Sequence, residues 1–199
     1  MNVNPVLQGT KFDIEYIPGP AATKFHLSPA RVKAAWGPVR SGKSTALVWR
    51  VFFKAKEAAA AGIGLRALLL RDSFRNLEDT TVKTFTEWLA PLGQFQRRQG
   101  VLDFVFDLDG KRHEVLFRHG QTAQDASSFL SSEYGFIGLE EVAPAFSPTG
   151  LISPGIAEEV FDIALTRLVQ RGMNNPELAI SCNPPTPQHW VNKRIISKS

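Results

Sequence analysis

One stretch of this sequence has the residue types and spacing of a phosphate-binding loop. From Gly37 to Ser44 it matches the pattern G-x-x-x-x-G-K-S. The glycines let the backbone turn its N–H groups inward around an anion, and the positive end of the following helix dipole faces the same point. Lys43 is expected on the β- and γ-phosphates, and the Ser44 hydroxyl in the coordination shell of Mg²⁺. The predicted nucleotide-binding residues are Gly37, Pro38, Val39, Arg40, Ser41, Gly42, Lys43, Ser44 and Thr45.

The segments on either side of this loop have the character that the motif requires. Residues 32–36 are short and apolar enough for a buried strand, and residues 46–58 have the composition of a helix. A strand, a glycine-containing loop and a helix in this order form the P-loop unit. We therefore predict that residues 37–45 bind a nucleotide, with Lys43 as a catalytic group.

Hydrophobic patterning predicts the other strands and helices of the chain. Apolar runs predict strands at 65–71, 134–139 and 178–180, helices at 80–89 and 157–171, and a hairpin with arms 102–107 and 113–118 around Asp109-Gly110. Residues 1–30 are expected to form a lead-in segment, with a short strand at 12–17 that Pro18-Gly19-Pro20 ends. This order predicts an α/β fold, with a mostly parallel central sheet sandwiched by helices and an antiparallel hairpin extension.

Three polar motifs each follow a predicted strand. They are the P-loop, the pair Glu140-Glu141, and the run Ser181-Cys182-Asn183. Ligands of parallel sheets bind beyond the carboxyl ends of the strands. We therefore expect all three motifs to converge on one edge of the sheet.

This combination is typical of a hydrolytic nucleotide site. Glu140 is expected to hold Mg²⁺ opposite Ser44, and Glu141 to position and deprotonate the attacking water. Ser181, Cys182 and Asn183 either sense the γ-phosphate and relay its loss or form only a turn before two prolines.

Phosphoryl transfer also needs positive charge beyond a lysine and a metal ion. Arg40 is either an arginine finger supplied in cis or an outward-facing side chain that pairs with a neighbouring element. Arg167 and Arg171, four residues apart on one face of a predicted helix, are alternatives, as a sensor or as a finger that reaches a neighbouring subunit. Ordinary surface charge is the other interpretation of these two. Phe25 and His26 either contact the base, or Phe25 packs in a loop and His26 is solvated there.

The composition is that of one soluble domain. The 199 residues suffice for one core, and the net charge of +4 permits a polyanionic partner without requiring one. Cys182 is the only cysteine, which excludes an internal disulfide and indicates a reducing compartment. The N-terminus lacks the features of a signal peptide and no apolar run approaches a membrane span, so we expect a cytosolic protein without a membrane partner.

Together these motifs resemble the N-terminal ATPase domain of tailed-bacteriophage large terminase subunits. The resemblance rests on the P-loop with its internal arginine, on LLLRDSFRNLEDT at 68–80 and on LSSEYGFIGLEEV at 130–142. It continues through Ser181 to Pro185 and through His189-Trp190, and it covers residues 16–196. The order and spacing of these motifs together are specific.

The resemblance implies an ASCE-type, RecA-like P-loop fold with ATP and Mg²⁺ as cofactors. Lys43 and Ser44 then belong to the Walker A motif, Glu140 is the Walker B acid, Glu141 is the catalytic glutamate and Arg40 is the cis finger. ATP hydrolysis would power the translocation of double-stranded viral DNA into a procapsid, with residues 181–183 coupling it to movement. The implied partners are double-stranded DNA, a homo-oligomeric ring of this chain (usually a pentamer on the portal protein) and the small terminase subunit. The implied location is the host-cell cytoplasm.

The family pattern also sets expectations for the extent of the chain. Residues 1–199 are expected to form a single ATPase domain, with 184–199 as the start of a linker to a nuclease domain. The chain stops at Ser199, too early for that domain, so we expect a truncated domain without nuclease activity. Two positions depart from the family: Glu140 stands where the family often has Asp, and Ala22 where an adenine-contacting glutamine is expected.

Two other functions stay open at this point. One is a helicase-like or other nucleic-acid-stimulated P-loop ATPase, although a helicase normally carries a second RecA-like domain. The other is a non-catalytic, nucleotide-dependent assembly module, against which the intact P-loop and acid pair argue. For DNA contact the sequence offers eight cations, most of which solvated surface charge explains as well. They are Arg66, Arg71, Arg75, Arg97, Arg98, Lys111, Arg112 and Arg118.

Overall fold

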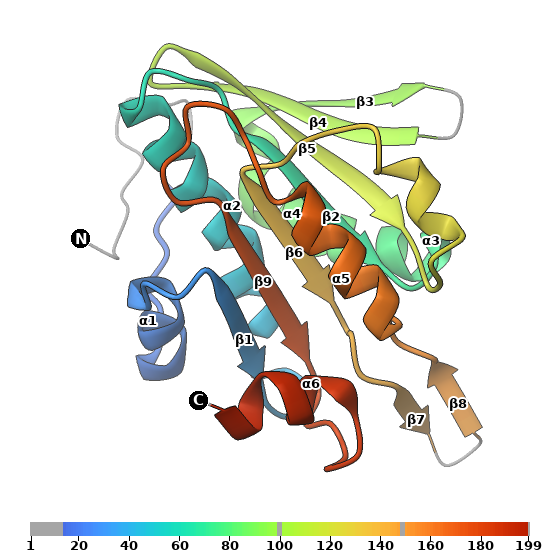
Figure 1. Cartoon of the computed structure of the whole chain (residues 1–199). Coiled ribbons are helices and arrows are strands. Elements are labelled where there is room, and N and C mark those ends of the chain that lie inside the picture. Colours follow the sequence, from blue (N-terminus) through green and yellow to red (C-terminus); the bar gives the residue numbers. More distant parts are fainter. Residues whose placement is uncertain (1–13, 99–100, 148–149, 199) are drawn as a thin grey trace.

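A seven-stranded sheet forms the centre of the structure (Figure 1). The computed structural model describes residues 14–98, 101–147 and 150–198. The strands of this sheet are β1 (Val32–Trp36), β2 (Arg66–Arg71), β3 (Gly93–Arg98), β4 (Val101–Leu108), β5 (Lys111–His119), β6 (Phe136–Glu140) and β9 (Glu177–Cys182). Their order in space is β1-β9-β6-β2-β5-β4-β3. Two further strands, β7 (Ala145–Ser147) and β8 (Gly150–Ser153), pair with each other in a separate antiparallel ribbon.

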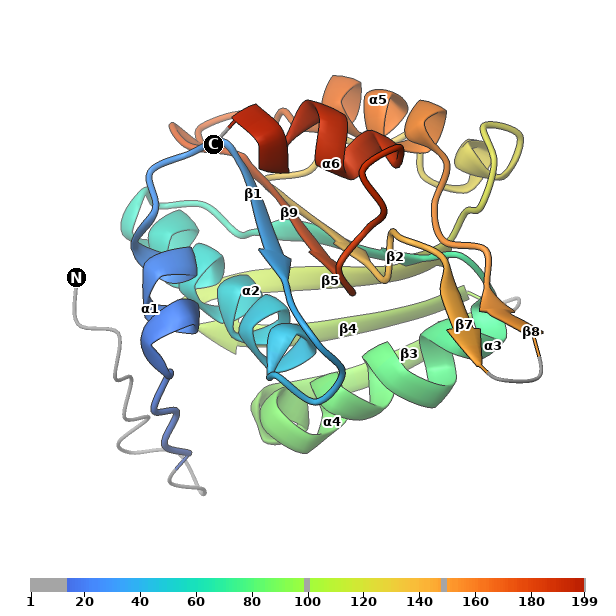
Figure 2. The same cartoon turned by 90° about the horizontal axis from the view of Figure 1, so that it is seen from below.

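Helices cover both faces of the sheet (Figure 2). One face carries α1 (Pro20–Leu27), α2 (Lys43–Ala60), α3 (Phe74–Asn76) and α4 (Lys83–Leu89), and the other carries α5 (Glu158–Arg167) and α6 (Trp190–Arg194). The remaining helical turns are a π-helix at Leu77–Val82 and 3-10 turns at Ala90–Leu92, Asp125–Ser128 and Ile196–Lys198. Within the described ranges, no helix combines the length and apolarity needed to cross a membrane.

Each face of the sheet has its own hydrophobic core, and β2 contributes to both. Ala67 and Leu69 lie in the core with α2 and α4, whereas Leu68 and Leu70 lie in the core with α5. Alternate residues of a strand point to opposite faces, so a strand covered on both sides must be apolar throughout. This requirement explains the continuous apolar run that predicted the strand.

The predicted mostly parallel sheet with an antiparallel extension is confirmed. β1, β9, β6, β2 and β5 pair in parallel, and β4 and β3 continue the sheet in antiparallel pairing. Asp109 and Gly110 both have positive φ, 51° and 71°, as a two-residue hairpin turn requires. The third antiparallel strand, β3, was not predicted, because the polar run Gly93–Arg98 has no apolar alternation to mark it.

Three predicted elements differ in the structure. Of the strand expected at 12–17, residues 12 and 13 lie outside the described ranges, and within 14–17 only Glu15 forms a bridge. Pro18-Gly19-Pro20 does not end a strand but begins α1, since proline suits the first helical turn. The helix expected at 157–171 is shorter and ends at Arg167.

The segment before β1 is fixed to α2 by aromatic and hydrogen-bonded contacts. The ring of Tyr16 stacks on Trp49 with centroids 4.7 Å apart, and its hydroxyl lies 3.1 Å from Nε2 of His26. Burial of His26, together with the charges of Arg50 and Lys33, lowers its pKa from 6.5 to about 4. His26 therefore stays neutral in the folded protein at pH values where an exposed histidine takes up a proton.

We expect acidification to destabilise the fold through His26. Between about pH 6.5 and pH 4 the unfolded chain binds a proton at this residue that the folded protein does not, so the free energy of unfolding falls as the pH falls. For a pKa difference of this size the loss amounts to about 3 kcal/mol. Urea denaturation at successive pH values across this range should show that the free energy of unfolding depends less steeply on pH in His26→Gln than in the wild type. Equal slopes for the two proteins would contradict the assignment to His26.

Candidate nucleotide-binding site

The P-loop joins β1 to α2, and its backbone is open to an anion. Gly42 precedes the helix with φ of 80°, in the left-handed region that favours glycine. Within the described residues, no side chain caps the start of α2 by a hydrogen bond, and its first turn contains no acidic residue. Ser44 and Thr45 lie in this turn. The N–H groups and the positive dipole end of α2 are therefore available to phosphate oxygens.

Lys43 is folded back onto the loop. Its Nζ donates to the carbonyl oxygens of Gly37 at 2.9 Å and Pro38 at 2.7 Å, and it lies 3.5 Å from Oδ1 of Asn183. Partial burial lowers the pKa of Lys43, and the carboxylates of Glu140 and Glu141 oppose this shift. The side chain thus connects the P-loop to the end of β9 and holds its charge close to where phosphates would bind.

The predicted convergence of the three motifs is confirmed by the register of the sheet. β9 pairs with β1 on one side and with β6 on the other, so that Trp36 lies opposite Cys182 and Glu140 lies opposite Ser181. The backbone N–H of Gly37 donates to the carbonyl of Cys182 at 3.3 Å. The P-loop, the acid pair and the end of β9 therefore occupy one edge of the sheet.

Within the run Ser181-Cys182-Asn183 only the last residue reaches the P-loop lysine. Ser181 and Cys182 are buried in the sheet. Burial raises the pKa of the Cys182 thiol to about 11, which keeps it uncharged. Asn183 follows the strand and is the side chain of this run that contacts Lys43.

Glu140 and Glu141 occupy different surroundings. Glu140 is the last residue of β6 and is 1% exposed, whereas the side chain of Glu141 is 32% exposed. Glu141 has φ of 49°, a conformation that non-glycine residues rarely adopt and that the surrounding structure must stabilise. The separate environments of the two carboxylates suit separate roles.

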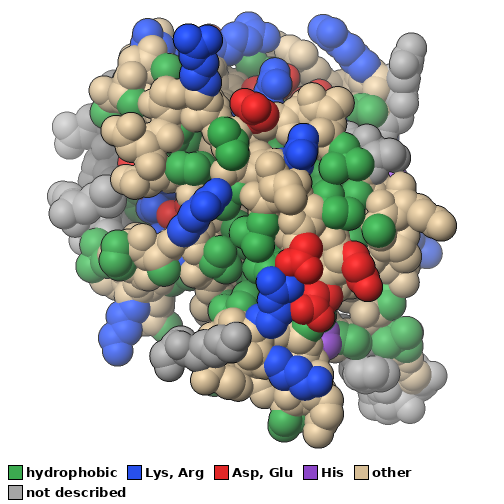
Figure 3. All heavy atoms as spheres, in the orientation of Figure 1, with side chains coloured by type: hydrophobic (Ala, Val, Ile, Leu, Met, Phe, Trp, Pro, Cys, Tyr) green, Lys and Arg blue, Asp and Glu red, His purple; other side chains and the backbone are tan. Residues whose placement is uncertain are grey.

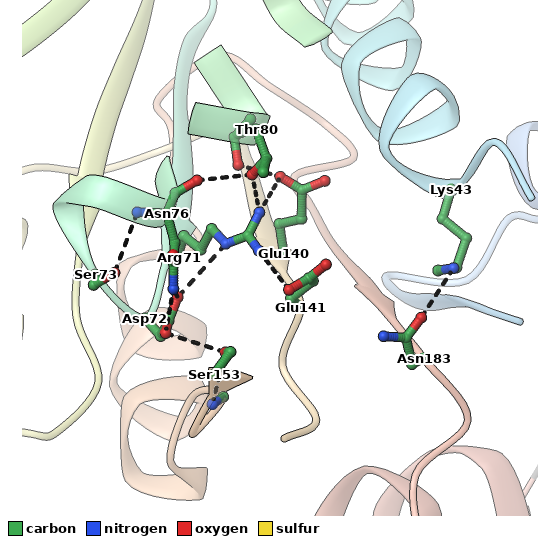
Figure 4. A network of polar contacts seen from close by, with 12 residues as sticks. Lys43, Arg71, Asp72, Ser73, Asn76, Thr80, Glu140, Glu141, Ser153 and Asn183 are labelled. Atoms are coloured by element: carbon green, nitrogen blue, oxygen red, sulfur yellow. Dashed lines mark hydrogen bonds and ion pairs between the residues drawn. The ribbon is translucent and has the colours of Figure 1, made fainter. Parts of the chain in front are cut away.

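Arg71, the last residue of β2, joins the carboxylates of two adjacent strands (Figure 4). Its Nη2 forms an ion pair with Glu141, its Nη1 lies 3.9 Å from Oε2 of Glu140, and its Nε lies 3.5 Å from Asp72. Arg71 is 4% exposed, so its interpretation as a surface cation for DNA is wrong. A signal was present in the sequence, because the apolar run of β2 ends in Arg-Asp while that of β6 ends in Glu-Glu.

Asp72 extends this network to the segment that follows β6. Its carboxylate accepts hydrogen bonds from Asn76 at 2.9 and 3.1 Å and from the Ser153 hydroxyl at 3.1 Å. Ser153 is the last residue of β8. The β7–β8 ribbon is thereby tied to the end of β2, next to the acid pair.

A cavity of about 1130 Å³ lies between α1, β1, the P-loop and the C-terminal segment. Ala22 and Phe25 of α1, Trp36 of β1 and Ile195 contribute to its wall. The cavity is open to solvent beside Trp36, which is the last residue of β1 and is 54% exposed. His26 is buried against Tyr16 instead, so it is neither the base contact nor the solvated loop residue of the two interpretations.

The predicted arginines lie in different parts of the structure. Arg40 is an exposed P-loop residue with φ of 63°, and both interpretations of it stay predictions. The carbonyl of Arg167 accepts from the N–H of Tyr134, which precedes β6, so Arg167 lies near the opposite end of β6 from Glu140. Arg171 lies beyond the end of α5, so the prediction that it shares a helix face with Arg167 is wrong. A role of either toward a neighbouring subunit stays a prediction.

Comparison with known proteins shows similarity of fold. No protein-family model and no curated protein matches the sequence. Among solved structures, the large terminase of a thermophilic bacteriophage superposes with a TM-score of 0.69 and 15% identity over 90% of this chain. The chain has the RecA-like fold of bacteriophage large terminases.

Other structures that share this terminase fold include complexes with nucleotides. The terminase of the same thermophilic bacteriophage gives a TM-score of 0.69 in complex with ADP, and in complex with ATP-γ-S it gives 0.66 with 14% identity. The large terminase of bacteriophage HK97 matches with a TM-score of 0.54 and 11% identity over 93% of this chain. The chain spans 42% of the thermophilic phage terminase and 38% of the HK97 terminase.

We expect the removal of the Arg71 charge to destabilise the protein strongly. Arg71→Met should lower the free energy of unfolding by about 3 kcal/mol or more, because Glu140 and Asp72 then lose a buried cation. Arg66→Met is the matched control at the other end of β2, where Arg66 forms a half-exposed ion pair with Glu114 whose loss costs below about 1 kcal/mol. Urea denaturation of both variants checks the difference, and equal losses would contradict a structural role of the Arg71 network.

Proposed function

We propose that this chain is the ATPase domain of a viral DNA-packaging motor and hydrolyses ATP with Mg²⁺. One observation supports this above all: Lys43 of the P-loop contacts Asn183 just after β9, and β9 is the strand between the P-loop strand and Glu140-Glu141. A nucleotide bound at the loop would therefore face two carboxylates. Structures of the same fold in complex with ADP and ATP-γ-S support the choice of ligand.

The P-loop binds the phosphates and orients the γ-phosphoryl group. Lys43 exchanges the carbonyls of Gly37 and Pro38 for phosphate oxygens, and the first N–H groups of α2 donate to the same oxygens. The Ser44 hydroxyl and the Glu140 carboxylate are hard oxygen donors of the kind that Mg²⁺ accepts beside phosphates, so the residues present fit this ion. When bound, Mg²⁺ neutralises charge on the phosphates.

Glu141 is the general base of the proposed reaction. Its carboxylate takes a proton from water as the water oxygen attacks the γ-phosphorus and the bond to the leaving ADP oxygen breaks. In the structure Arg71 holds Glu141 by an ion pair. The pair engages Oε2 of Glu141, so in this proposal the other carboxylate oxygen takes the proton while Arg71 holds the side chain in place.

We extend this proposal to the motor function, its partners and its location. The proposed partners are double-stranded DNA, a homo-oligomeric ring of this chain on a portal protein, and a small terminase subunit. The proposed location is the host-cell cytoplasm. The net charge of +4 supports contact with DNA phosphates. On the face in Figure 3 Lys and Arg side chains are spread over the surface, while acidic side chains gather over α5.

Glu141→Gln should lower the rate of ATP hydrolysis by roughly 100-fold or more while ATP binding persists, since a positioned base contributes that much to proton transfer. The measurement is steady-state phosphate release by the protein with Mg²⁺, with and without double-stranded DNA. Glu133→Gln is the control, because Glu133 is a carboxylate that precedes β6 and lies outside the acid pair.

Two outcomes would overturn parts of the proposal. Hydrolysis that Glu141→Gln and Glu133→Gln leave equally intact would remove the assignment of the base. Hydrolysis without any response to double-stranded DNA over a range of salt concentrations would contradict the motor function but leave the ATPase in place.

A further inference from the structure

A π-helical turn lies between β2 and α4, next to the acid pair. It spans Leu77–Val82 and directly continues α3 into α4. π-helical turns are rare, and those that do occur are often found at functional sites. Here two successive threonine hydroxyls contact the charged network: Thr80 accepts from Arg71, and Thr81 donates to Oε2 of Glu140.

Thr81 is a polar residue in an otherwise apolar stripe. Leu77, Phe85 and Leu89 are fully buried at spacings of four or eight residues along this helical segment, and Thr81 stands between the first two at 1% exposure. An apolar residue of the same size would pack at this position without a hydroxyl to satisfy. Packing alone therefore does not account for a threonine here, whereas the hydrogen bond to Glu140 does.

Among the described residues, the side-chain hydrogen bond and ion pair of Glu140 fall on one of its two oxygens. Thr81 donates to Oε2, and Nη1 of Arg71 lies 3.9 Å from the same atom. Figure 4 shows the second carboxylate oxygen of Glu140 pointing away from Arg71, toward the side of the view on which Lys43 lies. A carboxylate fixed through one oxygen presents the other in a defined direction.

We propose that Thr81 is a positioning residue that holds Glu140 in the orientation required to bind the metal ion of the metal–nucleotide complex. This inference rests on the proposed function, in which Glu140 is a metal ligand. Partners that orient a ligating carboxylate typically change metal affinity by roughly 10- to 100-fold when they are removed. Thr81 itself does not touch the substrate in this account.

The test compares nucleotide affinity with and without metal. A fluorescent ADP analogue is titrated into the protein with Mn²⁺ and, separately, with EDTA, and the ratio of the two dissociation constants gives the gain due to metal. Thr81→Val should reduce this gain roughly tenfold and leave the affinity in EDTA unchanged, because only the metal ligand is disoriented. Thr81→Ser, which keeps the hydroxyl, should retain the gain.

Thr86→Val is the matched control, since the Thr86 hydroxyl lies in α4 and donates only to the carbonyl of Val82 among the described residues. Circular dichroism melting confirms that each variant is folded. If Thr81→Val does not fold, Thr81→Cys, with a similar volume and a weak donor, is tested by the same criterion.

Four outcomes count against the inference, and they differ in what they leave standing. A full metal gain in Thr81→Val, or an equal loss of affinity in Mn²⁺ and in EDTA, would overturn the positioning role and leave the proposed function in place. A wild-type protein that binds the ADP analogue without any gain from Mn²⁺ would overturn the inference as well. A wild-type protein that does not bind the analogue at all would overturn the proposed function itself.

Discussion

The parallel pairing of β9 between β1 and β6 is the constraint on which the site depends. Because all three strands run in the same direction, their carboxyl ends deliver the P-loop, Asn183 and the acid pair to one edge. Helices cover both faces, and each strand side chain packs into one of two differently shaped cores, so close packing holds the register. The strand register that packs the two cores is therefore also the register that assembles the site.

The side chains at this edge are held in internal contacts. Lys43 donates to the carbonyls of its own loop, and Arg71 forms an ion pair with Glu141. The network around Arg71 is buried, and such a network is costly unless its members stay paired. The carboxylates of Glu140 and Glu141 also interact electrostatically with Lys43, so we expect phosphates bound at the P-loop to change the electrostatic environment of both.

The sequence predicted what local patterns encode and missed what depends on neighbours in space. The P-loop, the hairpin at Asp109-Gly110 and the buried strand before Glu140 follow from motif spacing and apolar runs. Arg71 and Thr81 could not be assigned, because their partners in the acid pair are 70 and 59 residues away and become neighbours only through the strand order. The contact of the Arg167 carbonyl, at the end of α5, with the N–H of Tyr134 likewise joins residues that are distant in the sequence.

The central claim is that the P-loop and the acid pair form one metal–nucleotide site, and calorimetric titration of ATP with Mg²⁺ tests it most directly. We expect one site per chain in the wild-type protein, loss of this site in Lys43→Ala, and a weaker contribution of Mg²⁺ in Glu140→Ala than in the wild type. ATP binding that is unaffected by Lys43→Ala, or a Mg²⁺ contribution that is unaffected by Glu140→Ala, would contradict it.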